Sequence, residues 1–311
     1  MNSVAGRKMI VLYGTTRVPQ RLMTQDRLQN SRSSTTLRWQ SQAVLLAFLP
    51  VTAIWVIFQV QMRWMGGDPV LRHTALISLA FTVMVALLRA ATPGAALTGG
   101  LFTAALYLQT PGLHTALWPL LTLFLLTFAA TRIGRRRKEL LGTAESKRGR
   151  NASQVAANLG AAVLAGIPLS AVHVFSPTTL DAHAALLAMV AAMAEATVDT
   201  LSSELGQVLG GEPRLITNFH RVPVGTDGAV TFAGTIAGCA GAAVVAIVGA
   251  VALRFSFRDA LLALAAGIAG LFFDSLLGAI PERRGWLNND AVNTLSTVAA
   301  ALLGAYCARW F

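Results

Sequence analysis

Long apolar segments alternate with short polar connections along almost the whole chain. Each segment is apolar over 16–25 residues, and together they predict helices over 43–61, 72–90, 94–109, 114–131, 153–175, 181–199, 229–253, 259–279 and 291–309. A helix needs about 20 apolar residues to cross a bilayer, and backbone groups in lipid must pair within their own segment. The third segment is short and contains Gly99 and Gly100, so the count is eight if this segment does not span the membrane. We therefore expect an all-α, polytopic transmembrane helical bundle of eight or nine spans with short loops.

Composition supports a membrane protein. The chain is 54% hydrophobic and 13% charged, against about 25% charged in soluble domains. The net charge of +11 is unevenly placed: with nine alternating spans, 20 of the 25 Lys and Arg fall on one side. This asymmetry is the positive-inside pattern and argues against nucleic acid as the partner. It predicts a cytoplasmic N-terminus and motif loops, in an integral protein of the bacterial inner membrane. The run RRRK, residues 135–138, is expected to anchor this topology at lipid headgroups.

The chain divides by composition into three parts. Residues 1–41 form a basic, Ser- and Thr-rich segment, expected to be a flexible cytoplasmic tail or else a targeting segment. Residues 42–131 hold hydrophobic helices with little chemistry, and residues 132–311 carry the polar motifs. Small residues dominate the later helices, and the spacing of Gly234 and Gly238 predicts close helix packing.

Two carboxylates stand out because the sequence has only 14 Asp and Glu, and Asp199 and Asp274 each lie near the end of an apolar segment. An acid in a membrane span indicates a polar cavity, a cation or a substrate. Glu195, Asp199 and Ser203 are four residues apart and share a helix face with Ser202 nearby, while Glu204 projects about 140° away from Asp199. Carboxylates with hydroxyls suit Mg²⁺. The alternative is a solvated helix end.

The motif GTDG supplies Gly225, Asp227 and Gly228, and it directly precedes an apolar segment. The glycines permit a tight turn with positive φ, and Asp227 is expected to cap the turn. Backbone N–H groups of such a turn, with a helix N-terminus, favour a phosphate. A simple loop is the alternative, and no GxxxxGK motif is present.

Amides and arginines gather near two other segment ends. Arg148, Arg150 and Asn151 precede the segment 153–175. At the start of the segment 291–309 lie Asn288, Asn289, Asp290 and Asn293. Such groups are suited to a nucleobase and phosphates, whereas helix capping and contacts between membrane helices are the alternatives.

The motifs taken together resemble a known family. KRGRNASQVAANLG, DTLSSELG, PRLIT, GTDG, DSLLGA and WLNNDAVN are similar to the integral-membrane family of transmembrane protein 19, whose plant chloroplast members are phytyl-phosphate kinases. The resemblance runs from about Arg72 to the C-terminus. Ala229, Thr231 and Val198 depart from the residues commoner in that family, but no carboxylate is lost.

The resemblance implies a membrane-embedded kinase that converts a prenyl monophosphate to its diphosphate with a nucleoside triphosphate, CTP being the expected one. On this reading Asp199, Glu204 and Asp274 are catalytic, and Mg²⁺ is held by Asp199, Asp274 and Asp227. Substrate binding falls to Arg148, Arg150, Asn151, Ser202, Ser203, Gly225, Asp227, Gly228, Asn288, Asn289, Asp290 and Asn293. A transporter of an ion or small metabolite and a lipid cytidylyltransferase remain as alternatives.

Overall fold

The computed structural model describes residues 37–146, 148–171 and 182–310. The predicted tail therefore lies outside the described residues up to position 36, as does the end of the predicted helix 153–175. The predicted tail also includes residues 38–41, but the first described helix begins with these residues, so this part of the prediction is wrong. Their side chains explain the difference, since Gln40 Nε2 donates to the Trp286 carbonyl at 2.8 Å and Ser41 Oγ donates to Asp290 at 2.6 Å.

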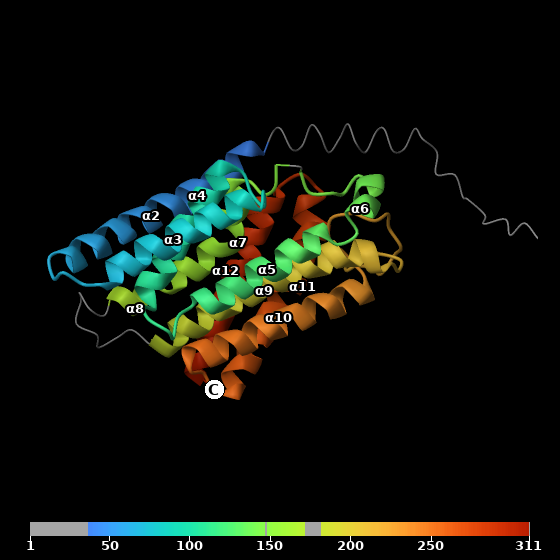
Figure 1. Cartoon of the computed structure of the whole chain (residues 1–311). Coiled ribbons are helices and arrows are strands. Elements are labelled where there is room, and N and C mark those ends of the chain that lie inside the picture. Colours follow the sequence, from blue (N-terminus) through green and yellow to red (C-terminus); the bar gives the residue numbers. More distant parts are fainter. Residues whose placement is uncertain (1–36, 147, 172–181, 311) are drawn as a thin grey trace, which may run out of the picture. The chain divides into compact units, whose positions relative to one another are not determined.

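Helices make up most of the described chain (Figure 1). Their bounds are α2 Arg38–Trp64, α3 Val70–Leu87, α4 Pro93–Gln109, α5 Leu117–Arg132, α6 Arg135–Leu141, α7 Ala152–Ala165, α8 Ile167–Ala171, α9 Ala182–Leu209, α10 Phe232–Leu253, α11 Phe257–Leu277 and α12 Asn289–Trp310. A π-helical turn, η1 Gly278–Glu282, extends α11. Two short strands, β1 Arg214–Leu215 and β2 Ala229–Val230, pair antiparallel.

Six described helices are long and apolar enough to cross a membrane, or seven if the bent pair α5–α6 counts as one span. The predicted all-α bundle is thus confirmed, whereas the count of eight or nine spans is not. The shortfall comes from α4, with 17 residues, and α7, with 14. Both helices are largely buried among their neighbours.

Polar residues at the helix starts fix where several helices begin. The Thr92, Asn151, Thr231 and Ser256 side chains each accept a hydrogen bond from the backbone N–H three residues on. Such caps satisfy N–H groups that have no partner within the helix. Helix α10 therefore begins at Phe232 after Thr231, rather than at Ala229 as the sequence predicted, and Ala229 belongs to β2.

Helix α9 is the central element and packs against α5, α7, α10, α11 and α12 (Figure 1). Small residues let α10 lie directly on it: a Cβ atom at Gly238 would come within 2.0 Å of Ser202 Oγ, and one at Gly234 within 2.4 Å of the Ser202 carbonyl oxygen. The predicted packing role of these two glycines is confirmed. Because α9 faces protein on most sides, its polar side chains are shielded from lipid.

The connecting segments with the sequence motifs meet at one end of the bundle. The Thr92 backbone N–H donates to the Arg150 carbonyl at 2.9 Å, and Lys138 pairs with Glu204. At the opposite end, His114 contacts the Ala252 carbonyl at 3.1 Å. Successive long helices in the described chain therefore alternate in direction, and the end with the motifs is called the motif end below.

Candidate functional site

A cavity of about 470 Å³ opens at the motif end. It is lined by α7, α9, α11 and α12, by the loop that follows α6 and by the turn before β2. The predicted site residues that line it are Arg150, Asp199, Ser202, Ser203, Glu204, Gly225, Asp227, Gly228, Asp274, Asn289 and Asn293. Segments up to about 150 residues apart in sequence thus contribute to one cavity.

Asp199 and Asp274 reach the cavity from neighbouring helices, α9 and α11. Ser296 Oγ on α12 donates to Asp274 Oδ1 at 3.2 Å. Glu195 lies one turn before Asp199, is only 1% exposed, and repels both aspartates electrostatically. This concentration of negative charge in a buried setting calls for a cation or a proton to balance it.

Glu282 joins the carboxylates because of the π-helical turn η1. Its charge acts on Asp274. An α-helix advances about 100° per residue, and a π turn shifts that register, often at functional sites. Glu282 is not among the site residues predicted from the sequence, because only Pro281 in DSLLGAIPE indicates such a turn.

Helix α9 runs on to Leu209, ten residues past the end predicted from the apolar pattern. Asp199, Ser202, Ser203 and Glu204 therefore lie within a continuous helix, and the interpretation as a helix end is wrong. Ser203 Oγ donates to the Asp199 carbonyl at 2.7 Å, whereas Ser202 Oγ is buried without a hydrogen-bond partner in the described structure. Of the two hydroxyls, the one of Ser202 is therefore available to bind a ligand.

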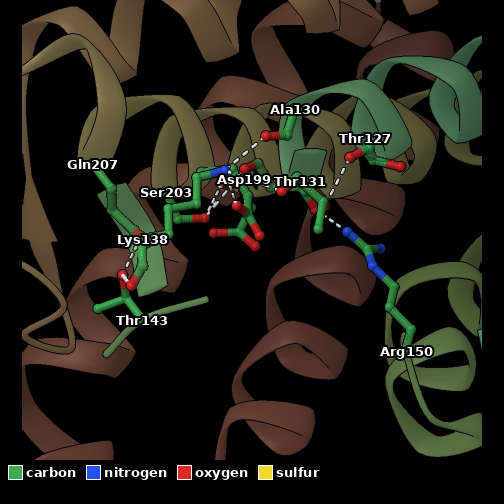
Figure 2. A network of polar contacts seen from close by, with 11 residues as sticks. Thr127, Ala130, Thr131, Lys138, Thr143, Arg150, Asp199, Ser203 and Gln207 are labelled. Carbon is green, nitrogen blue, oxygen red and sulfur yellow. Dashed lines mark hydrogen bonds and ion pairs between the residues drawn. The ribbon is translucent and has the colours of Figure 1, made fainter. Parts of the chain in front are cut away.

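Lys138 connects the end of α5 to α9 (Figure 2). Its amine donates to the Ala130 carbonyl at 2.7 Å, satisfying the C-terminal end of α5, and it forms an ion pair with Glu204. The 62° bend between α5 and α6 turns this lysine inward, where it is 0% exposed. The prediction that the whole run RRRK contacts lipid headgroups is therefore wrong at Lys138.

The glycine turn is required by close contact as well as by backbone angles. Gly225 and Gly228 have φ of +84° and +70°, which confirms the predicted positive-φ turn. A Cβ atom at Gly228 would lie 2.2 Å from the Ala279 backbone nitrogen, so the turn presses against η1. Asp227 lies between the two glycines of this turn, while Thr231 caps α10. Its carboxylate lies among protein groups, and this desolvation raises the pKa of Asp227, while the Arg283 guanidinium acts in the opposite direction.

Arg150 is held by paired backbone. Its N–H donates to the Ala90 carbonyl at 3.2 Å, and residues Ala91 and Arg150 form a parallel bridge. Gly149 allows this approach, because a Cβ atom there would meet the Ala90 carbonyl oxygen at 2.3 Å. The guanidinium then reaches Thr200 Oγ1 on α9 at 3.4 Å (Figure 2).

Four predicted substrate-binding residues lie outside the cavity lining. Arg148 is exposed on the connecting loop. Asn151 caps α7 in a capping box with Gln154. Asn288 accepts from the Ala291 N–H and donates to the Leu37 carbonyl at 3.0 Å. Asp290 accepts from Ser41 and, at 2.5 Å, from Ser153. Asn151 therefore acts in helix capping, and Asn288 and Asp290 hold α12 against α2 and α7, as the alternatives of capping and helix contacts predict.

The cavity lining is strongly acidic. It contains six carboxyl side chains and one arginine, and the carboxyl groups are Glu145, Asp199, Glu204, Asp227, Asp274 and Glu282. The N-termini of α7, α10 and α12 also border it through Gln154, Thr231 and Asn289. Helix N-termini carry partial positive charge and favour anions. The cavity thus offers oxygen ligands for a cation beside donors for an anion.

The residues present fit a magnesium ion that a substrate helps to hold. Among the described residues, no three His, Cys, Asp or Glu side chains form a group that could hold a metal alone. Mg²⁺ in such sites usually takes one or two carboxylates, water and substrate phosphates. Asp199 and Asp274 would supply the carboxylates, and Ser202 Oγ and Glu195 Oε1, which have no hydrogen-bond partner among the described residues, would offer further oxygen ligands.

The helical bundle and its acidic cavity define a polytopic integral membrane protein with a polar site at one end. Residues 76–301 match the family described as integral membrane protein DUF92, and the chain belongs to this family. The resemblance predicted from the motifs, to the family of transmembrane protein 19 and phytyl-phosphate kinase, is thereby confirmed. No solved structure matches the chain.

Three relatives illustrate the range of the family. An uncharacterized membrane protein of Methanocaldococcus jannaschii is 45% identical over 125 residues, 40% of this chain and 52% of that protein. An uncharacterized membrane protein of Synechocystis sp. is 32% identical over 184 residues, 59% of this chain and 70% of that protein. Protein VTE6, chloroplastic, of Arabidopsis thaliana is 31% identical over 176 residues, 56% of this chain and 52% of VTE6. The chain thus spans about half the length of the first and third relatives.

Proposed function

We propose that this protein is a membrane prenyl-phosphate kinase. It transfers the γ-phosphoryl group of a nucleoside triphosphate, CTP in our proposal, to a prenyl monophosphate such as phytyl phosphate. The observation that carries the proposal is the composition of the cavity, in which clustered carboxylates face an arginine and three helix N-termini. The family relationship, which includes VTE6, supports the same class of reaction.

The negative charge of the cavity favours binding of the nucleotide as its Mg²⁺ complex over binding of the free nucleotide. Six carboxyl groups against one arginine would repel a free triphosphate. Bound Mg²⁺ would bridge phosphate oxygens and offset their charge. Asp199 and Asp274 would hold that ion, with Asp227 close to it on the glycine turn. Glu204 is paired with Lys138 and would support the site by fixing α6 against α9.

The reaction needs little covalent work from the protein. An oxygen of the prenyl phosphate attacks the γ-phosphorus and forms a new P–O bond, while the bond to the β,γ-bridging oxygen breaks and the nucleoside diphosphate leaves. The attacking phosphate is already an anion, so a strong general base is unnecessary. Catalysis then depends on position and on compensation of charge. Arg150 would hold the acceptor, and the turn at Gly225–Gly228 would donate backbone N–H groups to the nucleotide phosphates.

The test is phosphoryl transfer by the purified full chain in detergent, with Mg-CTP and radiolabelled phytyl or geranylgeranyl phosphate. Prenyl diphosphate and CDP are the expected products. Asp199→Asn and Asp274→Asn should each lower turnover at least about 100-fold, because each removes charge from the proposed ion site. Glu139→Gln is the matched control, since Glu139 is exposed at the same end and forms its ion pair with Arg135 on the surface.

Two outcomes would overturn the proposal in different ways. Release of inorganic diphosphate in place of CDP would identify a cytidylyltransferase. Absence of product with every prenyl phosphate, together with cation-dependent uptake into proteoliposomes, would identify a transporter. Full turnover by both aspartate variants would instead refute the assignment of the site.

A further inference from the structure

A second, apolar cavity meets the acidic cavity at Arg150. It lies between α3, α4, α5 and α7 and is lined by aliphatic and aromatic side chains. Phe81 on α3 packs edge to face with Phe124 on α5, with ring centroids 5.4 Å apart. Arg150, Asn158 and Glu145 line both cavities. A molecule could therefore occupy both at once.

A third cavity of about 520 Å³ continues the apolar one toward the other end of the bundle. Phe81 and Leu120 line both of these apolar cavities. Together the two form what we call the apolar groove, which follows α5 from Leu117 to Arg132. Fifteen helical rises correspond to about 22 Å.

The mouth of the apolar groove carries the opposite charge to the acidic cavity. Its ionisable lining residues are four arginines and one glutamate: Arg89, Arg132, Arg135, Arg150 and Glu145. The Arg132 guanidinium is fixed over the Phe128 ring, 4.2 Å from its centroid, and donates to the Leu88 carbonyl at 2.6 Å. Positive charge is thus concentrated where the groove opens toward the six carboxyl groups of the neighbouring cavity.

We propose that the apolar groove binds the isoprenoid chain of a prenyl monophosphate, with the phosphate held by the arginines at its mouth. This inference rests on the proposed kinase function and names the subsite of its acceptor. The acceptor phosphate lies against Arg150, at the junction of the cavities, where an oxygen can reach a nucleotide in the acidic cavity. The separated charges keep the two phosphate-bearing substrates in different cavities.

The dimensions favour a single long chain. A main chain of sixteen carbons has fifteen bonds and extends about 19 Å at roughly 1.25 Å per bond, close to the length of the groove. The part nearest Arg150 has a volume of only about 110 Å³, which suits one chain and not the two chains of a phospholipid. The far part of the groove is open at the surface, since Leu113 and Trp118, which line it, are 83% and 50% exposed, so a membrane-dissolved chain can enter there.

The experiment shortens the groove and compares chain lengths. Ile77 lines the far part of the groove on α3, whereas its neighbour Leu76 is exposed on the outer surface. Ile77→Trp should weaken binding of geranylgeranyl phosphate about tenfold and leave geranyl phosphate unchanged, and Leu76→Trp should change neither. Binding is measured by calorimetry in detergent without nucleotide, and kcat/KM with Mg-CTP is measured in parallel. Leu121→Trp, which fills the same part from α5, replaces Ile77→Trp if that variant does not fold.

A second pair of variants tests the mouth. Arg89→Gln should weaken both prenyl phosphates, and Arg136→Gln, an exposed neighbour of the bend that lines neither cavity, should weaken neither. If binding depends on chain length but no turnover occurs, the proposed binding groove is supported and the proposed kinase function is refuted. If turnover occurs but both tryptophan variants change kcat/KM equally for long and short prenyl phosphates, the kinase function is supported and the binding groove is refuted.

Discussion

At the scale of single residues, function and packing compete for the same positions. Asp274 and Asp290 both look like site residues in the sequence, yet Asp274 lines the acidic cavity and Asp290 joins α2, α7 and α12 through serine hydroxyls. Both acids are costly in a membrane protein. Two serine hydroxyls donate to Asp290 Oδ2, whereas Asp274 accepts from one hydroxyl and faces other carboxylates, so it has capacity for a further ligand.

Gly228 provides a prediction at this scale. Gly228→Ala should destabilise the protein more than Gly211→Ala, by about 2 kcal/mol or more in the free energy of unfolding. Both glycines have positive φ, but a Cβ atom at Gly228 meets Ala279 and one at Gly211 meets nothing within 4 Å. The difference between the variants therefore isolates the contact between the turn and η1.

Thermal unfolding of both variants in detergent checks this prediction. Phosphoryl transfer should also fall in Gly228→Ala, because the turn carries Asp227. Equal unfolding temperatures for the two variants would contradict the close contact.

At the scale of elements, the apolar pattern predicts where helices occur better than where they end. Its wrong boundaries, at Asp199 and at Ala229, have causes far away in the sequence. The polar end of α9 stays helical because α6, α10 and the glycine turn surround it. Ala229 forms β2 because Arg214–Leu215 lies beside it.

The candidate site divides in the same way. Asp199, Asp274 and the glycine turn could be found from the sequence, because an acid or a glycine pair next to an apolar run is a local signal. Glu282 and Lys138 could not, because a π-helical turn and a bent helix pair bring them inward. Neither distortion has a distinctive local pattern.

The bend between α5 and α6 provides a second prediction. Lys138→Met should lower the free energy of unfolding by about 3–5 kcal/mol, because it leaves a shielded Glu204 without its partner. The double variant Lys138→Met/Glu204→Gln should recover part of that loss, since the unpaired charge is gone. Arg136→Met is the control, because Arg136 is exposed.

Unfolding followed by circular dichroism in detergent gives the comparison. A Lys138→Met variant as stable as Arg136→Met would show that the ion pair does not hold the bend in place.

At the scale of the whole molecule, most of the positive charge lies at the same end of the bundle as the acidic cavity. The structure describes 18 of the Lys and Arg residues, which excludes those in residues 1–36 and at position 147. Of these 18 residues, 13 lie in segments at the motif end. Positive charge is retained on the cytoplasmic side of membranes. We therefore propose that the acidic cavity opens to the cytoplasm, where nucleoside triphosphates are available.

Cysteine labelling tests this orientation. In a background with Cys239→Ala and Cys307→Ala, Arg136→Cys at the motif end should resist a membrane-impermeant maleimide in intact cells. Met65→Cys, which replaces a side chain 87% exposed at the opposite end, should react. The reverse result would place the cavity outside the cytoplasm.

The central position of α9 also has a consequence for how the protein is made. Two of its neighbours, α5 and α7, precede it in the chain, while α10, α11 and α12 follow it. When α9 first enters the bilayer, the side that carries Glu195 and Asp199 has no helix beside it, and an acid at mid-membrane costs about 2.5–3.5 kcal/mol. The last three helices therefore complete the insertion of a helix synthesised before them. A chain that stops after Leu209 would expose the acidic side of α9 to lipid. We expect such a truncated chain to be degraded faster than the full chain.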